Sequence, residues 1–292
     1  MKKIKKIEYR KNQDLRNYCT FRIGGIAKHL YIAKSKQNLI DLINYCTENK
    51  KNFKVIGLGA NLLFDFKQTN KIIIVNRSNR FIKKDNSIYV SSGMNLSEFI
   101  SKCASLELSG MSDLAGIPAT IGGAIVNNVG AFNSSISDYI DYVVAINKNN
   151  PSKIIKIPKT DCKFGYRKSI FQSGDFVILS AKFSLPHETK NRISKDIIYA
   201  IKRKNSSQPL DFPSAGSIFK RGKIIPAKAI DELGLKGLKI GGAMISPKHA
   251  GYIINTGNAT SKDVIELINL IEKRIFDTKN VQIEREIEIV KK

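Results

Sequence analysis

The sequence predicts an α+β protein, and three features of the 292-residue chain support that fold class. Short apolar runs of strand length occur beside segments whose apolar residues recur every three or four positions, as in helices. Hydrophobic residues make up 42% of the chain and charged residues 25%, so a sizeable core can form. Strands and helices come in mixed order, which favours α+β over a doubly wound sheet.

Two helices are predicted in the first half of the chain, and a serine begins each of them. Ser35 stands at a capping position after a short strand, and Ser97 opens the second helix. The apolar residues that follow recur at helical spacing and mark the buried face of each helix. They are Leu39, Leu42, Ile43 and Cys46 in the first helix, and Phe99, Ile100, Cys103 and Leu106 in the second.

Three further helices are predicted in the second half. A helical segment at 196–203, with Ser194 as its cap, is expected to link two lobes. Pro226 begins a short helix that ends at Leu233. A capping box at 260–263 precedes the longest helix. The apolar face of that helix consists of Val264, Ile268, Ile271 and Ile275.

Strands are predicted where short apolar or alternating runs lie between turn residues. The last of them, at 281–290, alternates apolar and charged residues, which places Glu284, Glu286 and Glu288 on one face. The other predicted strands lie at 30–33, 53–57, 72–75, 88–90, 142–147, 154–157, 176–185 and 251–255.

The formal net charge of +24 has two explanations. A strongly basic protein can attract polyanions such as nucleic acid or anionic lipid. Lysine is instead spread along the whole chain and gathers into no single stripe, which favours biased residue usage over a nucleic-acid-binding surface. Scattered lysines would still attract a diphosphate or a phosphorylated nicotinamide cofactor.

The cysteines and the N-terminal residues indicate a soluble cytoplasmic protein. No two cysteines form a C-x-x-C pair, and the three histidines are dispersed, so no metal site is predicted. Single thiols fit a reducing compartment. The basic start lacks an apolar signal segment, and no apolar run approaches the ~20 residues of a membrane span. The cysteines are Cys19, Cys46, Cys103 and Cys162.

Two glycine-rich turns are candidates for binding a phosphate. The turn at 57–62 follows a predicted strand, and glycine there lets backbone N–H groups approach an anion. The stretch at 116–131 has so few large side chains that backbone or a ligand is expected to fill its space. A surface loop is the alternative, but Ile117, Ile121 and Val126 do not suit one. Neither turn is a G-x-G-x-x-G that opens a helix, which disfavours a Rossmann nicotinamide site.

Three other segments contain polar residues that could take part in catalysis, although each has an ordinary structural explanation. Arg167 lies in an aromatic and apolar setting, where a buried salt bridge would equally explain it. Ser217 follows Gly216 near two bases, as a turn serine would. The acidic residues at 284–288 fit a solvated sheet face.

Taken together and in order, seven segments resemble the UDP-N-acetylenolpyruvoylglucosamine reductase family. Each motif is weak alone, but the seven cover nearly the whole chain in the right order. They are 20–25, the turn at 57–62, 116–131, 164–171, 214–220, 245–255 around His249, and 284–286.

The resemblance implies a PCMH-type (vanillyl-alcohol-oxidase-like) FAD-binding domain at 1–190, with lobes at about 1–75 and 76–190. A substrate-binding domain follows at 191–292, and its last strand returns to the active site. FAD is expected to bind non-covalently, because no histidine lies in either glycine-rich turn. NADPH is the implied hydride donor, a UDP-sugar the substrate, and a monomer the expected state, without nucleic acid or membrane as partner. The short gap between Arg167 and Ser217 resembles the family's second type, which lacks an extra substrate-closing loop.

The resemblance also implies roles for individual residues. Ser217 is the implied proton donor, with Arg167 and Glu286 as the other catalytic residues. The implied substrate-binding residues are Tyr166, Lys220, Arg221 and His249. The implied cofactor-binding residues are Arg22, Gly57, Gly59, Ala60, Asn61, Leu62, Gly116, Ile117, Pro118, Ala119, Thr120, Gly122, Gly123 and Ala124.

Three positions depart from the family pattern. Ala119 replaces a usual glycine, Ser207 a frequent basic residue, and Glu288 a common arginine. These departures concern the pyrophosphate turn, one substrate phosphate contact and a solvent-side position. The rival interpretations are another FAD-dependent oxidoreductase on the same scaffold, such as a lactone or hydroxy-acid oxidase, and a basic nucleic-acid-binding protein.

Overall fold

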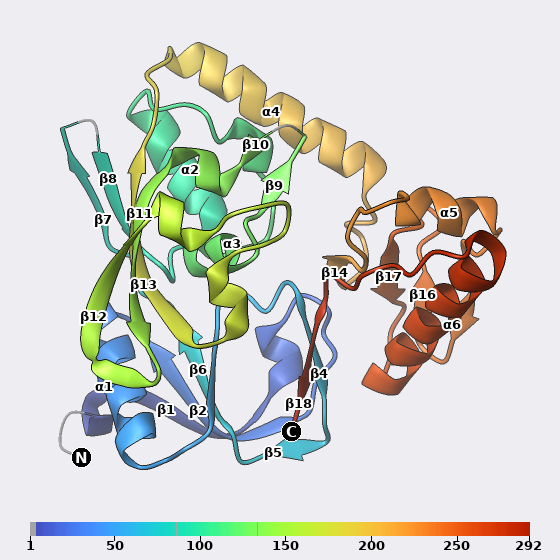
Figure 1. Ribbon diagram of the computed structural model, residues 1–292, viewed down its shortest axis with the longest axis horizontal. Helices are drawn as coiled ribbons and strands as arrows, with labels where there is room; N and C mark the ends of the chain where they lie inside the picture. Colours follow the sequence, from blue (N-terminus) through green and yellow to red (C-terminus); the bar gives the residue numbers. More distant parts are fainter. Residues whose placement is uncertain (1–3, 86, 133) are drawn as a thin grey trace. The chain divides into compact units, whose positions relative to one another are not determined.

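The computed structural model describes residues 4–85, 87–132 and 134–292, which form two compact units (Figure 1). The first unit contains the chain up to Lys11, His29–Leu58 and Lys71–Arg203. The second unit contains Asn12–Lys28, Gly59–Asn70 and Lys204–Lys292. Two short N-terminal segments therefore belong with the C-terminal part of the chain. The domain boundary at residue 190 stays a prediction.

A sheet that contains parallel strand pairs lies mostly in the first unit. Its strand order is β1-β2-β6-β3, and the β2–β6 and β3–β6 pairs are parallel. Parallel strands need a crossover connection, and α1 (Lys36–Glu48) connects β2 to β3, which both pair with β6. Ser35 caps α1 as predicted, since its hydroxyl accepts the Asn38 N–H at 3.0 Å. The strands are β1 (Glu8–Asp14), β2 (Ile26–Ala33), β3 (Phe53–Ile56) and β6 (Ile72–Asn76). The short strand β5 (Gln68–Thr69) pairs with the start of β2 and belongs to the second unit.

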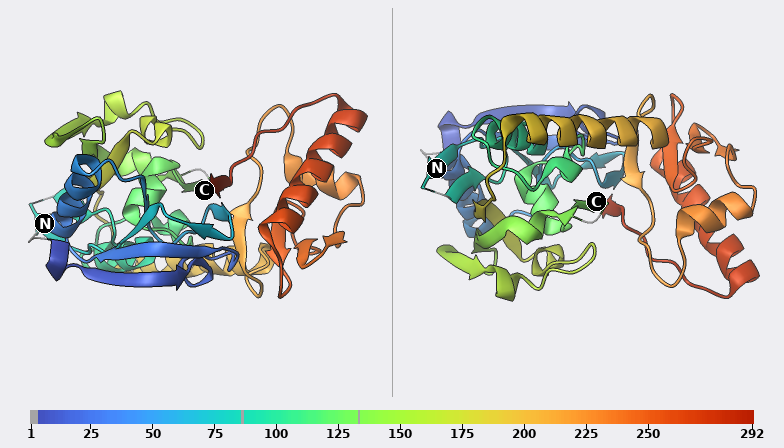
Figure 2. Two further views of the ribbon diagram at one scale, coloured as in Figure 1. Left: turned by 90° about the horizontal axis from the view of Figure 1, so that it is seen from below. Right: turned by 90° about the horizontal axis from the view of Figure 1, so that it is seen from above.

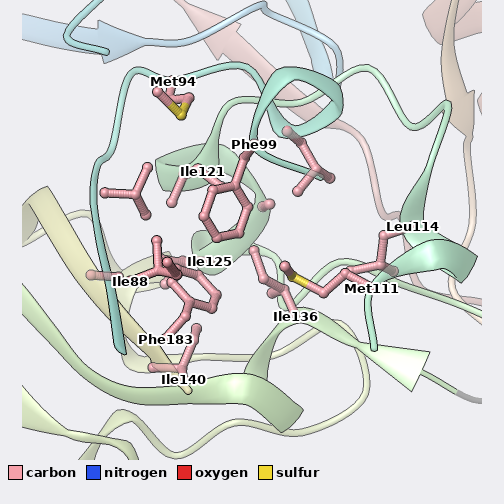
Figure 3. Close-up of a cluster of buried hydrophobic side chains, with 14 of the residues drawn as sticks. Ile88, Met94, Phe99, Met111, Leu114, Ile121, Ile125, Ile136, Ile140 and Phe183 are labelled. Carbon is pink, nitrogen blue, oxygen red and sulfur yellow. The ribbon is translucent and has the colours of Figure 1, made fainter. Parts of the chain in front are cut away.

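An antiparallel sheet forms the rest of the first unit, in the order β12-β11-β13-β8-β7. The core cluster against it (Figure 3) includes Phe99 and Phe183, whose ring centroids lie 4.9 Å apart. The strands are β7 (Phe81–Lys84), β8 (Ser87–Ser91), β11 (Ile140–Asn147), β12 (Asn150–Pro158) and β13 (Phe176–Ser184). The helices are α2 (Leu96–Ser105), α3 (Ile121–Val126) and α4 (Lys190–Ser207), and β9 (Gly130–Ala131) pairs with β10 (Ser134–Ser135).

The second unit has its own sheet and its own core. Its antiparallel strands follow the order β14-β17-β16-β15, and β18 pairs in parallel with β4. Helix α6 begins at the predicted capping box, in which Thr260 and Asp263 cap one another. The elements are β4 (Leu62–Asp65), β14 (Ser214–Ser217), α5 (Pro226–Glu232), β15 (Lys239–Ile240), β16 (Ala243–Ile245), β17 (Tyr252–Asn255), α6 (Ser261–Lys279) and β18 (Glu288–Lys291).

The α+β class is confirmed, but three local predictions were wrong. Helix α2 begins at Leu96, because Asn95 and not Ser97 caps it; the Asn95 side chain accepts the Ser97 N–H at 2.8 Å. Ser194 lies inside α4, which already begins at Lys190. The last strand is confined to 288–291, because the segment before it bonds irregularly to the residues just after β14.

Candidate active site

Two glycine-rich stretches meet inside the first unit. Gly57 follows β3, and a Cβ atom placed on it would overlap the hydroxyl of Thr120. Arg77 fixes the same turn, because its Nη1 donates to the Gly57 carbonyl at 2.9 Å. A side chain at position 57 would therefore force the stretch at 116–124 away. The requirement for glycine here comes from packing within the protein.

Backbone hydrogen bonds hold the second stretch in a fixed conformation. The Leu96 N–H donates to the Ala119 carbonyl at 2.8 Å, and the Gly122 N–H donates to the Ser92 carbonyl at 2.7 Å. The Thr120 hydroxyl accepts the Gly123 N–H at 3.3 Å and so caps the short helix α3. Ile121 is fully buried. The stretch is therefore a fixed structural element rather than a solvated loop.

Gly123 is different, because no packing contact in the described part of the chain requires a glycine there. The residue is exposed, and a Cβ on it would make only an ordinary contact, 3.5 Å from the Thr120 hydroxyl. In a helix, alanine is favoured over glycine by about 1 kcal/mol. Glycine at position 123 therefore lowers the stability of the helix, and no packing contact among the described residues compensates for this loss. The main chain at Gly57 and at 119–124 is here called the cradle. Its bare backbone at Gly123 fits the close approach of a pyrophosphate, which FAD binding requires.

The two glycines predict different outcomes for alanine substitution. We expect Gly57→Ala to destabilise the flavin-free protein by about 1–3 kcal/mol, because the added methyl displaces Thr120. We expect Gly123→Ala to leave the flavin-free protein equally or more stable but to weaken FAD binding. Thermal unfolding without flavin and titration with FAD measure the two effects separately. Unchanged FAD affinity in Gly123→Ala would contradict the cradle.

The rest of the turn at 57–62 belongs to the second unit and has structural roles there. Gly59 has φ +64°, and a Cβ on it would overlap the carbonyl of Tyr18. The Asn61 side-chain amide donates to the Glu286 carbonyl at 2.9 Å, and the Asn61 carbonyl accepts the Glu288 N–H at 3.0 Å. Asn61 therefore holds the C-terminal segment beside β4. A cofactor contact from these residues stays a prediction.

Arg22 also lies in the second unit, and its backbone has φ +52°. Its exposed side chain borders a depression of about 270 Å³. The other residues around this depression are Phe212, Pro213, Asn255, Thr256 and Gly257. Cofactor binding by Arg22 stays a prediction.

The backbones of Ser217 and Glu286 are brought together although the two residues are 69 positions apart in the sequence. The intervening link is Ile218, whose carbonyl accepts the Glu286 N–H at 2.7 Å. Ser217 ends β14 opposite Tyr252, after a register shift that coincides with Gly216 at φ +76°. Such a bulge changes the direction of the side chain that follows it. The structure therefore places the two predicted catalytic residues on adjacent backbone segments, and both side chains are half-buried.

His249 lies beside Ser217. A Cβ placed on Gly251 would lie 3.1 Å from the Ser217 Oγ and 3.0 Å from the His249 Cε1, so both groups border one small space. The Gly251 N–H donates to the His249 Nδ1 at 3.1 Å, which leaves the proton of the neutral ring on Nε2. The Tyr252 ring contacts the imidazole edge-on at 4.9 Å between centroids. Tyr252 is a site neighbour that the sequence analysis missed.

Burial lowers the pKa of His249 below its ordinary value of 6.5, and the nearby charges of Lys236 and Arg221 lower it further. The folded protein therefore binds fewer protons at this ring than the unfolded chain does, and stability is lost as pH falls below 6.5 through the folded pKa. We expect the melting temperature of His249→Gln to depend less on pH in this range than that of the unsubstituted protein. Parallel pH dependence in both proteins would contradict this assignment.

Lys220 is held by an acidic residue of the C-terminal segment. Its ammonium lies 2.5 Å from the Glu284 carboxylate, and its N–H donates to the Glu284 carbonyl at 2.8 Å. The Lys220 side chain is mostly buried, whereas Arg221 is exposed. A substrate phosphate would have to compete with Glu284 for Lys220. Substrate binding by both bases stays a prediction.

Arg167 and Tyr166 lie in the first unit at the tip of a tight turn. Two hydrogen bonds between Gly165 and Lys168, each 3.1 Å, close this turn, and Arg167 has φ +51°. A non-glycine residue with positive φ is uncommon and often marks a functional site. The Arg167 Nη2 donates to the Gly130 carbonyl at 2.9 Å, which orients the guanidinium.

Asn128 supports this turn and was absent from the predicted site. Its side-chain amide donates to the Gly165 carbonyl at 2.8 Å, and its own carbonyl accepts from Arg167 at 3.5 Å. Asn128 is buried and has φ +40°. Asn128 lies in the glycine-rich stretch at 116–131, and this position could have marked it as a candidate site residue. Only the folded chain shows that it contacts the turn at Arg167.

The bare backbone at Gly123 and the fixed turn at Arg167 are the features of the first unit that fit a flavin-dependent oxidoreductase. A family model for an FAD-binding domain matches residues 27–150. A second family model, for the C-terminal domain of UDP-N-acetylenolpyruvoylglucosamine reductase, matches residues 208–290. The two matches cover most of the chain in the order that the resemblance implies.

The chain belongs to the UDP-N-acetylenolpyruvoylglucosamine reductase family. The reductase of Caldanaerobacter subterraneus subsp. tengcongensis is 38% identical over 96% of this chain and 92% of its own. The reductase of Clostridium novyi is 34% identical over 98% and 94%. The crystal structure of the reductase from Thermus caldophilus superposes with a TM-score of 0.80 at 28% identity, over 97% of this chain and 98% of the other.

Proposed function

We propose that this chain reduces UDP-N-acetylenolpyruvoylglucosamine to UDP-N-acetylmuramate, a precursor of peptidoglycan, with non-covalently bound FAD and with NADPH as hydride donor. The observation that supports this most directly is the hydrogen bond that joins the Glu286 backbone to the residue after Ser217. Ser217 and Glu286 thereby lie on adjacent stretches of backbone, although they come from segments far apart in the sequence.

The residues that would hold FAD are those of the cradle: the backbone at Gly57 and at 119–124. The fixed hydrogen bonds of this stretch keep its backbone in one conformation, so little conformational entropy is lost on binding. When bound and reduced by NADPH, FAD supplies the hydride for the enolpyruvyl group.

Three side chains would complete the reduction. Hydride addition places negative charge on the substrate carboxylate, and the Arg167 guanidinium would stabilise it, with help from Glu286. The Ser217 hydroxyl would then donate its proton to the α-carbon, which gives the lactyl ether of the product. Tyr166, Lys220, Arg221 and His249 are the proposed substrate-binding residues. Ser207 offers no charge at its position, so fewer phosphate contacts are expected there.

An anaerobic two-step experiment tests this function. NADPH should bleach the yellow colour of the purified protein, and UDP-N-acetylenolpyruvoylglucosamine should restore it. A lactone or a hydroxy acid serves as the control: it can only donate hydride, and added to the oxidised protein without NADPH it should leave the yellow colour unchanged. Bleaching by the control compound would assign the chain to another flavin oxidoreductase, and a colourless protein would reject the proposal.

We also propose that the enzyme works as a monomer in the cytoplasm. All four cysteines are buried free thiols, and burial raises the pKa of Cys46 and of Cys103 to about 12. Free thiols are usual in a reducing compartment. Among the described residues, no helix is long and apolar enough to cross a membrane, and no three His, Cys, Asp or Glu side chains cluster as metal ligands.

A further inference from the structure

Helix α4 has two faces of opposite character. Ile193 and Ala200 are 2% and 1% exposed and pack into the protein. Ile198 and Tyr199 point the other way and are 53% and 67% exposed. In the right-hand view of Figure 2, no other element of the first unit lies in front of α4. Large apolar side chains on the open face of a helix indicate a surface that contacts a partner.

Basic residues surround these apolar side chains. Lys195, Ile198, Tyr199 and Lys202 are three or four positions apart and so form one continuous surface, here called the outer patch. All four are exposed. The single acidic residue of α4, Asp196, is 3.4 Å from Arg192. The other exposed bases of the helix are Lys190, Arg192 and Arg203.

We infer that the outer patch of α4 docks the enzyme onto an anionic lipid surface. A helix with lysines beside isoleucine and tyrosine lies well in the headgroup region, where its apolar side chains leave water and its bases meet phosphates. The net charge of +24 attracts the whole molecule to such a surface. Spanning helices are not needed for this mode of binding.

Two other occupants fit the patch less well. A second copy of this chain would bring two strongly basic surfaces together, and like charges oppose that contact. Nucleic acid would pair with the lysines, but the aliphatic side chain of Ile198 gains little from phosphates or base edges. The arrangement of charge around exposed aliphatic groups therefore favours lipid. The inference is independent of the proposed reaction, since no residue of the outer patch belongs to the proposed site.

Vesicle flotation with the full-length, FAD-loaded protein tests the inference. The vesicles consist of phosphatidylcholine alone or of phosphatidylcholine mixed with phosphatidylglycerol. One variant combines Ile198→Ser with Tyr199→Ser, and a second combines Lys195→Gln with Lys202→Gln. The matched control combines Ile154→Ser with Lys153→Gln, because Ile154 on β12 is 46% exposed beside a lysine. NADPH oxidation without vesicles shows that each variant is folded.

We expect the unsubstituted protein and the control to bind only the anionic vesicles. Removing two lysines should weaken binding roughly 10- to 30-fold, because each base near such a surface contributes about 1 kcal/mol. Removing Ile198 and Tyr199 should weaken it at least tenfold while the dependence on salt persists. Equal binding by that variant would mean adsorption by charge alone and would overturn the inference. If the unsubstituted protein bound neither kind of vesicle, the inference would be overturned as well. The same holds if the protein bound DNA and only the lysine variant lost that binding.

Discussion

Replacing Ser217 with alanine should leave a yellow protein that NADPH still reduces but that UDP-N-acetylenolpyruvoylglucosamine no longer reoxidises at a normal rate. General acid catalysis contributes about 10²–10⁴-fold, so the second half-reaction should slow by at least that order. The first half-reaction needs no proton from Ser217 and should be unchanged. Anaerobic stopped-flow measurement of the flavin colour resolves the two steps in one protein.

Ser214→Ala is the matched control for this variant. Ser214 begins the strand that Ser217 ends, and it meets its neighbours through its backbone: its carbonyl accepts the Thr20 hydroxyl at 2.7 Å. That bond survives loss of the Ser214 side chain, so both half-reactions should proceed normally. If Ser217→Ala turned over substrate as fast as Ser214→Ala, Ser217 would not be the proton donor.

Arg167→Lys should slow the same half-reaction by about 10²–10³-fold, the usual cost of losing one preorganised group that stabilises developing charge. A lysine keeps the positive charge but offers a single ammonium in place of a planar fork. It cannot reproduce the bond from the guanidinium to the Gly130 carbonyl while also facing a carboxylate. The reoxidation rate with saturating substrate measures this loss.

The backbone strain at position 167 does not complicate this test. A backbone φ of +51° is equally unfavourable for arginine and for lysine. A difference in reoxidation rate between the two proteins is therefore due to the charged group of the side chain. Arg80→Lys serves as the control, because Arg80 is an exposed residue of the same unit. Retention of most of the reoxidation rate in Arg167→Lys would show that charge alone suffices at this position.

Signals within a few residues were sufficient for most elements. Ser35 and the capping box at Thr260 both begin helices as predicted, because each cap bonds to a backbone N–H only three positions away. The predictions that Ser97 and Ser194 cap helices were wrong for a related reason. The sequence does not distinguish a serine that caps a helix from one that lies inside it. In α2 the cap is Asn95, two positions before Ser97.

The last strand shows where alternation is insufficient. Residues 281–290 alternate as a strand would, yet regular pairing begins only at Glu288, beside β4. Before that point the segment bonds to the loop after β14, through Lys220 and Ile218. The pattern of apolar residues predicts which side chains become buried, but it does not specify the neighbouring segment.

The sequence by itself determined the fold class, the helix caps at Ser35 and Thr260, the glycine-rich stretches and, through seven ordered motifs, the family. Only the tertiary structure decided that Thr120 packs on Gly57, that Gly123 is left bare, and that Ile218 joins Ser217 to Glu286. The physical reason is the distance along the sequence between the residues that interact. Caps and periodicity depend on bonds within one or two turns, whereas these contacts join segments more than 60 positions apart, and their pairing depends on how whole strands and cores assemble.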